Sequence, residues 1–319
     1  MEFADGLARS VDDFAGVWLR TELQEPLGVL GPSWEQHPHR VVLWVQARSS
    51  PSAGALFADI RCPADQSPMY PPPSAPQTAE LAQLQLLKSF AGVTTFDSDE
   101  AQIEWRREVD FRLPGSPDVG TVHFLPCPEL PGGLLQEDGV LPGDDYREIW
   151  RRISLPEVTD CSVRLRCGET GAGAGARAGA GEVGADSVGF VLLVGDWFIV
   201  TLSRLQTDEA LLDSLRLVFE QQQEGSEAQE QQEGMEGQQG QLAAALSHLR
   251  QCPYLAAAGH IIDWRIKHSV QPALIGCSLV QSETDGRESE ESGLRALLRE
   301  CVWEVVDGHV PEALSPYLV

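Results

Sequence analysis

The chain has 319 residues, of which 48 are Asp or Glu and 23 are Lys or Arg, so its formal net charge at pH 7 is −25. An acidic excess of this size, with no segment rich in Lys or Arg, argues against nucleic acid and anionic membranes as partners. Hydrophobic residues make up 42% and charged residues 22% of the chain, as in ordinary globular proteins, and no apolar stretch is long enough to cross a membrane.

The runs typical of strands greatly outnumber those typical of helices. Most of them are rich in Val, Ile, Phe, Trp and Thr and are bounded by Gly or Pro clusters. In chain order they cover residues 14–23, 40–47, 55–61, 102–112, 120–125, 161–167, 188–194, 197–203, 259–268, 273–280 and 301–306. Residues 188–203 read as a hairpin around Gly195-Asp196. Many strands without regular alternation with helices predict a mostly β, antiparallel barrel or sandwich.

Two segments have helical spacing of their apolar residues. Residues 78–90 place Leu81, Leu84 and Leu87 on one side, and residues 144–153 do the same with Tyr146 and Trp150. We expect the second helix to lie at the mouth of the barrel or to pack on its outside.

Three segments have the composition of flexible insertions. Residues 168–187 are rich in Gly and Ala, residues 220–241 in Gln and Glu, and residues 281–293 in acidic residues. Without them and a Pro-rich loop, roughly 230 to 250 residues of globular sequence remain, which favours one large domain. We therefore predict a single barrel domain over residues 10–306, interrupted by these insertions and followed by a tail at 307–319.

The most specific local motif is Gly16-x-Trp18, which stands where the first strand begins. Glycine permits a tight turn there, and the tryptophan ring can close the base of a barrel. The motif resembles the Gly-x-Trp signature of the calycin superfamily, which comprises the lipocalins and their relatives. Further blocks resemble a little-characterised lipocalin-like family of bacteria and eukaryotes; they are residues 42–46, 57–63, 89–92, 105–111, 117–120, 144–150 and 303–305. The resemblance implies a calycin-like antiparallel β-barrel and brings no catalytic assignment.

Strand alternation suggests which side chains face the barrel interior. On residues 102–112 the apolar face, from Ile103 to Phe111, should point inward, and it carries Arg107 with it. On the third strand Asp59 and Arg61 share a face with Phe57, so both enter the lumen if that face is internal. The candidate ligand contacts are Trp44, Gln46, Arg61, Trp105, Arg107, Tyr146 and Trp150.

The sequence leaves three functions open. The leading hypothesis is a small-molecule-binding barrel for an apolar or amphipathic ligand, including an anionic one held by Arg61 or Arg107. The second is a cofactor-independent enzyme that moves protons in the same cavity, with Asp59, Asp110 and His123 as the candidate acids and bases. The third is an interaction protein in which the acidic insertions bind a partner and the barrel, with a filled interior, is their scaffold.

Several chemistries are not expected from this sequence. It has no Gly-x-Ser-x-Gly, Gly-Lys-Ser/Thr or His-Glu-x-x-His motif. Its seven cysteines, at positions 62, 127, 161, 167, 252, 277 and 301, are scattered without a Cys-x-x-Cys pair, which indicates reduced thiols. We expect no metal and no cofactor. The first residues also lack the features of a secretory signal, so the expected location is cytoplasmic.

Overall fold

The structure is a computed structural model, and it describes seventeen stretches of the chain. They are residues 7–24, 40–51, 54–63, 88–111, 118–127, 129–130, 133–141, 146–157, 160–167, 187–204, 213–214, 217, 240–241, 243–246, 255–261, 265–269 and 303–308. Several predicted segments lie outside these stretches: the three proposed insertions apart from residues 187, 240 and 241, the tail after residue 308, the strand expected at 273–280 and most of the helix expected at 78–90.

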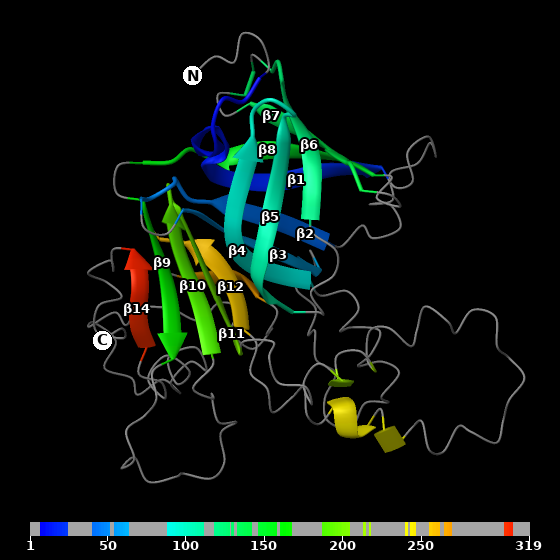
Figure 1. The fold of residues 1–319 in the computed structure, drawn as a ribbon, viewed down its shortest axis with the longest axis vertical. Helices are drawn as coiled ribbons and strands as arrows, with labels where there is room; N and C mark the ends of the chain where they lie inside the picture. Colours follow the sequence, from blue (N-terminus) through cyan, green and yellow to red (C-terminus); the bar gives the residue numbers. More distant parts are fainter. Residues whose placement is uncertain are drawn as a thin grey trace, which may run out of the picture.

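Eight consecutive strands form a closed antiparallel barrel, as the sequence predicted (Figure 1). They are β1 (Gly16–Gln24), β2 (Arg40–Gln46), β3 (Ala55–Pro63), β4 (Lys88–Asp97), β5 (Gln102–Asp110), β6 (Asp118–Leu125), β7 (Leu134–Gly139) and β8 (Arg147–Ser154). Each strand pairs with its sequence neighbour, and β8 pairs with β1 to close the barrel. No helix among the described residues is long and apolar enough to cross a membrane.

The remaining six strands form a second antiparallel sheet beside the barrel, in the order β13-β12-β11-β10-β9-β14. They are β9 (Cys161–Cys167), β10 (Ser187–Val194), β11 (Trp197–Arg204), β12 (Leu255–His260), β13 (Arg265–Ser269) and β14 (Trp303–Gly308). The predicted hairpin is present, because Val194 pairs with Trp197 across Gly195-Asp196. Gly195 has φ +57°, as the first position of a type II′ turn requires. The barrel itself therefore closes within residues 16–154.

The helix predicted at residues 144–153 is wrong. Residues 147–154 are strand β8, paired with β1 and β7. Trp150 faces the lumen with the other internal aromatics, whereas Ile153 packs with the residues outside the barrel. Because both faces of this strand carry apolar side chains, the expected alternation is blurred and the spacing imitates a helix. The structure also adds β4 and β7, which the sequence analysis did not identify, and residues 88–90 of the helix expected at 78–90 belong to β4.

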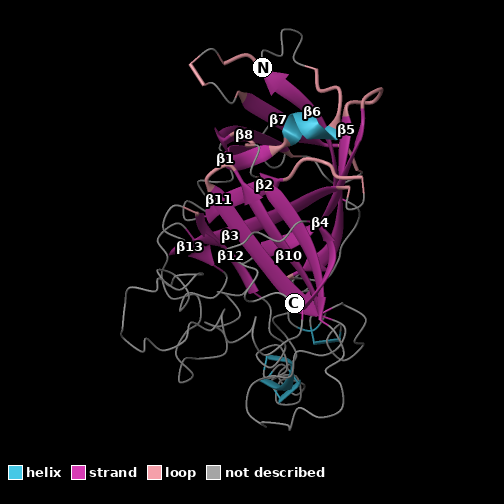
Figure 2. Cartoon of the chain, turned by 90° about the vertical axis from the view of Figure 1, so that its left-hand side faces the viewer, coloured by secondary structure: helices cyan, strands magenta, loops and turns pink. Residues whose placement is uncertain are grey.

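Two hydrophobic cores share the strands of the barrel. One core fills the lumen; its members are Phe14, Trp18, Val42, Trp44, Phe57, Phe90, Ile103, Trp105, Val122, Phe124, Leu135 and Trp150. The other lies between the outside of β1–β5 and one face of the second sheet, where Leu56, Ala58 and Ile60 of β3 join the cluster that contains Phe190 and Ile199. Figure 2 shows the second sheet lying across the barrel wall. The barrel strands on this side are therefore buried on both faces.

The inward face predicted for residues 102–112 is correct only as far as Arg107, because β5 contains a β-bulge after that residue. Ile103, Trp105 and Arg107 face inward as expected, but the register shifts between the pairs Gly92–Arg107 and Ala91–Val109. The extra residue, Glu108, reverses the alternation after it. Val109 and Phe111 therefore pack outside the barrel, and Asp110 turns inward with Arg107.

The amino-terminal end of β1 lies at a capped end of the barrel. The 3₁₀ helix η1 (Val11–Phe14) places Phe14 against Phe96 and Phe124, with ring centroids 5.0 and 5.7 Å apart. Trp18 Nε1 donates a hydrogen bond of 2.7 Å to the Phe14 carbonyl oxygen. The Arg152 guanidinium lies 4.3 Å from the centroid of Trp18, within cation–π range. This end of the lumen is filled by aromatic rings.

We expect Gly92→Ala to destabilise the protein through the bulge. A Cβ atom at position 92 would lie 2.0 Å from the carbonyl oxygen of Arg106, so the β4–β5 pairing must shift. The expected loss in the free energy of unfolding is about 1–3 kcal/mol, measured by denaturant titration. Gly240→Ala is the control, because nothing lies within 4 Å of its added Cβ. Equal stability of the two variants would contradict this account of the bulge.

Candidate functional site

The opposite end of the barrel lumen is charged. Antiparallel pairing brings the end of β3 beside the start of β4, and likewise β5 beside β6 and β7 beside β8. The inward ionisable residues at these strand ends, with one from β1, are Arg20, Asp59, Arg61, Lys88, Arg107, Asp110, Asp118, Glu137 and Glu148. Charges buried in this way need partners.

Three arginines pair with most of these carboxylates. Arg61 Nε lies 2.9 Å from Asp59 Oδ1, and its Nη1 lies 3.9 Å from Glu148 Oε1. Arg20 also forms an ion pair with Glu148.

Arg107 bridges two acids on different strands. Its Nη1 lies 3.1 Å from Asp110 Oδ2, and its Nη2 forms an ion pair with Asp118. Burial alone would raise the pKa of Asp118, but Arg107 and Lys88 hold it below its ordinary value. Burial raises the pKa of Asp59 despite its contact with Arg61.

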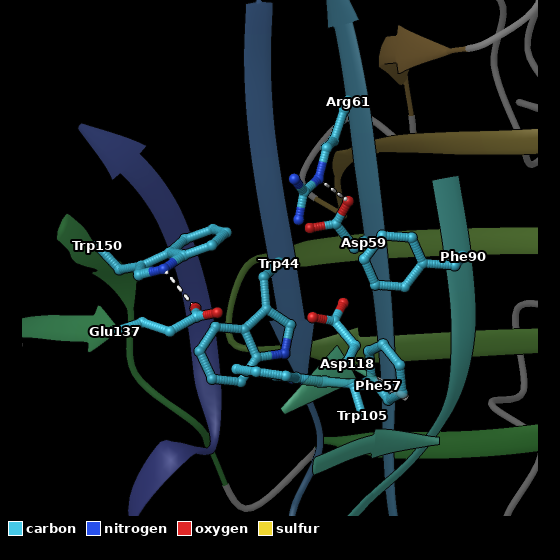
Figure 3. Close-up of a pocket in the computed structure, with 9 residues that line it drawn as sticks. All are labelled: Trp44, Phe57, Asp59, Arg61, Phe90, Trp105, Asp118, Glu137 and Trp150. Carbon is cyan, nitrogen blue, oxygen red and sulfur yellow. Dashed lines mark hydrogen bonds and ion pairs between the residues drawn. The ribbon is translucent and has the colours of Figure 1, made fainter. Parts of the chain in front are cut away.

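A pocket lies where this charged end meets the aromatic filling of the lumen (Figure 3). Its lining residues are Trp44, Phe57, Asp59, Arg61, Phe90, Trp105, Asp118, Glu137 and Trp150. The empty space between them, including the part open to solvent, is about 240 Å³, and a water molecule fits only a small part of it. The pocket therefore has room for about one water molecule or one group of similar size.

Glu137 is the one carboxylate of the pocket whose hydrogen-bond donors are both neutral. Its Oε1 accepts a hydrogen bond of 2.8 Å from the Tyr146 hydroxyl, and its Oε2 accepts one of 2.9 Å from Trp150 Nε1. Among the described residues, no Lys or Arg forms an ion pair with it. It stands directly opposite Glu148 across the β7–β8 pairing. Burial, with Glu148 and Asp118 nearby, raises the pKa of Glu137 well above its ordinary value.

Trp44 lies at the centre of the pocket wall. Its ring makes edge contacts with Trp105 and Trp150, at centroid distances of 5.6 and 5.7 Å. The residue is 2% exposed, yet its Nε1 has no hydrogen-bond partner. Figure 3 shows the indole nitrogen on the side of the ring nearest Asp118 and Phe57. A buried indole N–H usually finds an acceptor, so this donor is available to a bound molecule.

Lys88 adds to the charged end a cation whose pKa is unusually low for a lysine. It is one of only two lysines in the chain, and its Nζ lies 5.3 Å from the Phe90 ring centroid. Burial, together with Arg61 and Arg107, lowers the pKa of Lys88 to about 8. A neutral amine is therefore accessible close to physiological pH.

The structure brings together several residues proposed from the sequence. Trp44, Arg61, Trp105 and Trp150 line the pocket with Asp59. Tyr146 reaches it through Glu137, and Arg107 and Asp110 lie beside it as an ion pair.

Two of the proposed residues lie elsewhere. Gln46 is buried next to Thr94, whose hydroxyl donates to its Oε1 at 2.7 Å. His123 alternates with Val122 and Phe124, which belong to the lumen core, so its side chain points to the outside of the barrel. It does not converge with Asp59 or Asp110.

Sequence reasoning missed five ionisable residues of the charged end: Arg20, Lys88, Asp118, Glu137 and Glu148. A partial signal existed for Glu137, because Leu135 and Glu137 alternate on a short run that ends at Gly139. The described residues contain no group of three or more His, Cys, Asp or Glu side chains arranged to hold a metal ion.

Comparisons with known proteins add little to this picture. No family model matches the chain, and no curated protein matches it. The computed structure is similar to the crystal structure of the uncharacterized protein YLR301w from Saccharomyces cerevisiae, at 12% sequence identity and a TM-score of 0.45. The similarity covers 92% of this chain and 99% of the yeast chain. A likeness at this level supports no conclusion about function.

We expect Glu137→Gln to change how stability depends on pH. The raised native pKa means that the folded wild type binds more protons than the unfolded chain above about pH 4. Its free energy of unfolding should therefore fall, relative to the variant, as the pH rises towards the native pKa of Glu137. The slope of this difference is at most about 1.4 kcal/mol per pH unit.

Denaturant titrations of both proteins across the acidic and neutral range measure this difference. Glu100→Gln, at an exposed turn position, is the control and should show no such trend. A constant difference between wild type and Glu137→Gln at every pH would contradict the raised pKa.

Proposed function

We propose that this protein binds a small amphipathic molecule at the charged end of its barrel, with the polar group in the pocket and the apolar part against the aromatic walls. The observation that carries the proposal is the buried, unpartnered Nε1 of Trp44 on the pocket wall. A closed barrel with an aromatic lumen and a few polar groups has the chemistry of many ligand sites. A hydroxyl, carbonyl or carboxylate oxygen would satisfy the indole donor.

The size of the pocket limits the ligand. Only one group about as large as a water molecule fits the enclosed part, so the remainder must lie in the part open to solvent. The two guanidinium groups that could hold an anion, Arg61 and Arg107, are already paired with carboxylates. A negatively charged ligand would have to compete with those carboxylates.

The closed antiparallel barrel is compatible with a calycin-like fold. We extend the proposal to membership of a lipocalin-like family, which the Gly16-x-Trp18 motif supports. Gly16 has φ +143°, and a Cβ there would lie 2.8 Å from the Ser154 carbonyl oxygen, so the geometry favours glycine at the start of β1. The cytoplasmic location remains a prediction from the sequence.

An enzyme is the second candidate, and the contact between Tyr146 and Glu137 favours it. Burial raises the pKa of both groups, and contact with Glu137 raises that of Tyr146 further, whereas the Tyr146 hydroxyl acts against the rise at Glu137. The two groups lie within hydrogen-bond distance. A protonated Glu137 could serve as a general acid. Conversion of a bound probe over time, lost in Glu137→Gln, would identify this activity; a probe recovered unchanged argues for binding alone.

The first test of binding follows the indole N–H groups by NMR in protein labelled with ¹⁵N-tryptophan. Trp44→Phe identifies the Trp44 signal by its disappearance. We expect this signal to shift when 1-propanol, propylamine or propionate is added, because a polar group enters the pocket. The Trp197 signal, from β11 of the second sheet, is the internal reference. If none of the three probes moves the Trp44 signal, the binding proposal is wrong, and a filled scaffold becomes the better explanation.

A further inference from the structure

We infer that the polar group this pocket selects is a primary ammonium, held by Glu137 and the surrounding aromatic faces. The inference rests on the proposed binding function and specifies the charge of the ligand. The sequence analysis expected that Arg61 or Arg107 could hold an anionic ligand, whereas this inference assigns a cation to the pocket.

The first argument is the balance of charge at this end of the lumen. The described residues there comprise five carboxylates, Asp59, Asp110, Asp118, Glu137 and Glu148, and four cations, Arg20, Arg61, Lys88 and Arg107. Four of the carboxylates contact a guanidinium group. Glu137 alone has only neutral donors, from Tyr146 and Trp150. When Glu137 is ionised, one further positive charge would complete the pairing.

The second argument is the electrostatic field that neighbouring charges create around Glu137. Glu148 faces it across the β7–β8 pairing and Asp118 lines the same pocket, and both disfavour its ionisation. Arg61 on β3 acts in the opposite direction, although more weakly. A site where several carboxylates oppose one another attracts a cation and repels an anion.

The third argument is the size and nature of the walls. The enclosed space admits a group of about the volume of one water molecule, which matches an –NH₃⁺ group and is too small for a trimethylammonium or guanidinium group. Trp44, Trp105, Trp150, Phe57 and Phe90 supply the walls. Aromatic faces attract cations, most strongly where water is excluded.

Trp44 adds a requirement that the ammonium alone does not meet. Its Nε1 is a donor without an acceptor, and an –NH₃⁺ group has only donors. Because the enclosed space admits one small group, an oxygen for this donor and the ammonium would compete for the same place. The ligand class is therefore a small primary amine.

Binding of such an amine should displace a proton. Where Glu137 is protonated in the free protein, the carboxylic proton leaves to solvent as the ammonium ion enters, and the resulting carboxylate pairs with it. Affinity should therefore rise with pH up to the native pKa of Glu137, while the amine itself stays charged. Titration calorimetry in two buffers of different ionisation enthalpy measures the protons released.

The decisive comparison uses propylamine, 1-propanol and propionate, three probes that differ only in the polar group. We expect propylamine to bind about tenfold or more tightly than 1-propanol at neutral pH, with proton release, and propionate to bind most weakly. Glu137→Gln should bring the affinities of propylamine and 1-propanol close together, whereas Glu100→Gln should preserve their ratio.

The outcomes separate the two proposals. If 1-propanol or propionate shifts the Trp44 signal but propylamine binds no more tightly, the inference of an ammonium site is wrong and the binding function stands. If no probe shifts the signal, both proposals are wrong and the pocket holds water only. Proton release with wild-type protein is a readout that does not depend on how Glu137→Gln folds, and its absence at the pH where Glu137 is protonated would overturn the ammonium assignment.

Discussion

The burial of charge inside a closed barrel is the constraint on which the rest of this structure depends. Eight strands enclose an interior that side chains must fill, and carboxylates placed there lose their hydration. The chain meets this cost with arginines that each serve two acids: Arg61 contacts Asp59 and Glu148, and Arg107 contacts Asp110 and Asp118. Guanidinium groups suit this arrangement because their several donors lie in one plane and remain charged.

Burial of the barrel wall strengthens the constraint. Where the second sheet covers β1–β5, the outward side chains of these strands belong to a hydrophobic core of their own. The strands there are held from both sides, and the lumen side chains have little freedom to move apart. At the capped end, Phe14, Trp18 and Trp44 fill the width of the lumen. Apart from Arg152, which lies over Trp18, the inward charged residues therefore lie at the remaining end, where strand termini leave room for long polar side chains.

The sequence supported the fold class and part of the site. Strand alternation correctly placed Trp105 and Arg107 inside, because the first half of β5 keeps regular register. It failed for Val109 and Asp110, since a bulge depends on how two strands meet, and neither strand alone records it. It also failed for β8, whose two apolar faces reflect a covering sheet that local spacing cannot reveal. Glu137 could not be recognised as special, because its lack of a cation emerges only when four other strands are assembled around it.

The bulge links these features. Glu108 is the inserted residue, and it points outward to form an ion pair with Arg164 of β9. The same insertion turns Asp110 into the lumen, where it shares Arg107 with Asp118. With regular alternation in β5, Asp110 would face the covering sheet, and Arg107 would have one fewer acid to neutralise inside. A single backbone irregularity, accommodated by the glycine at position 92, therefore directs Glu108 towards the second sheet and Asp110 into the lumen.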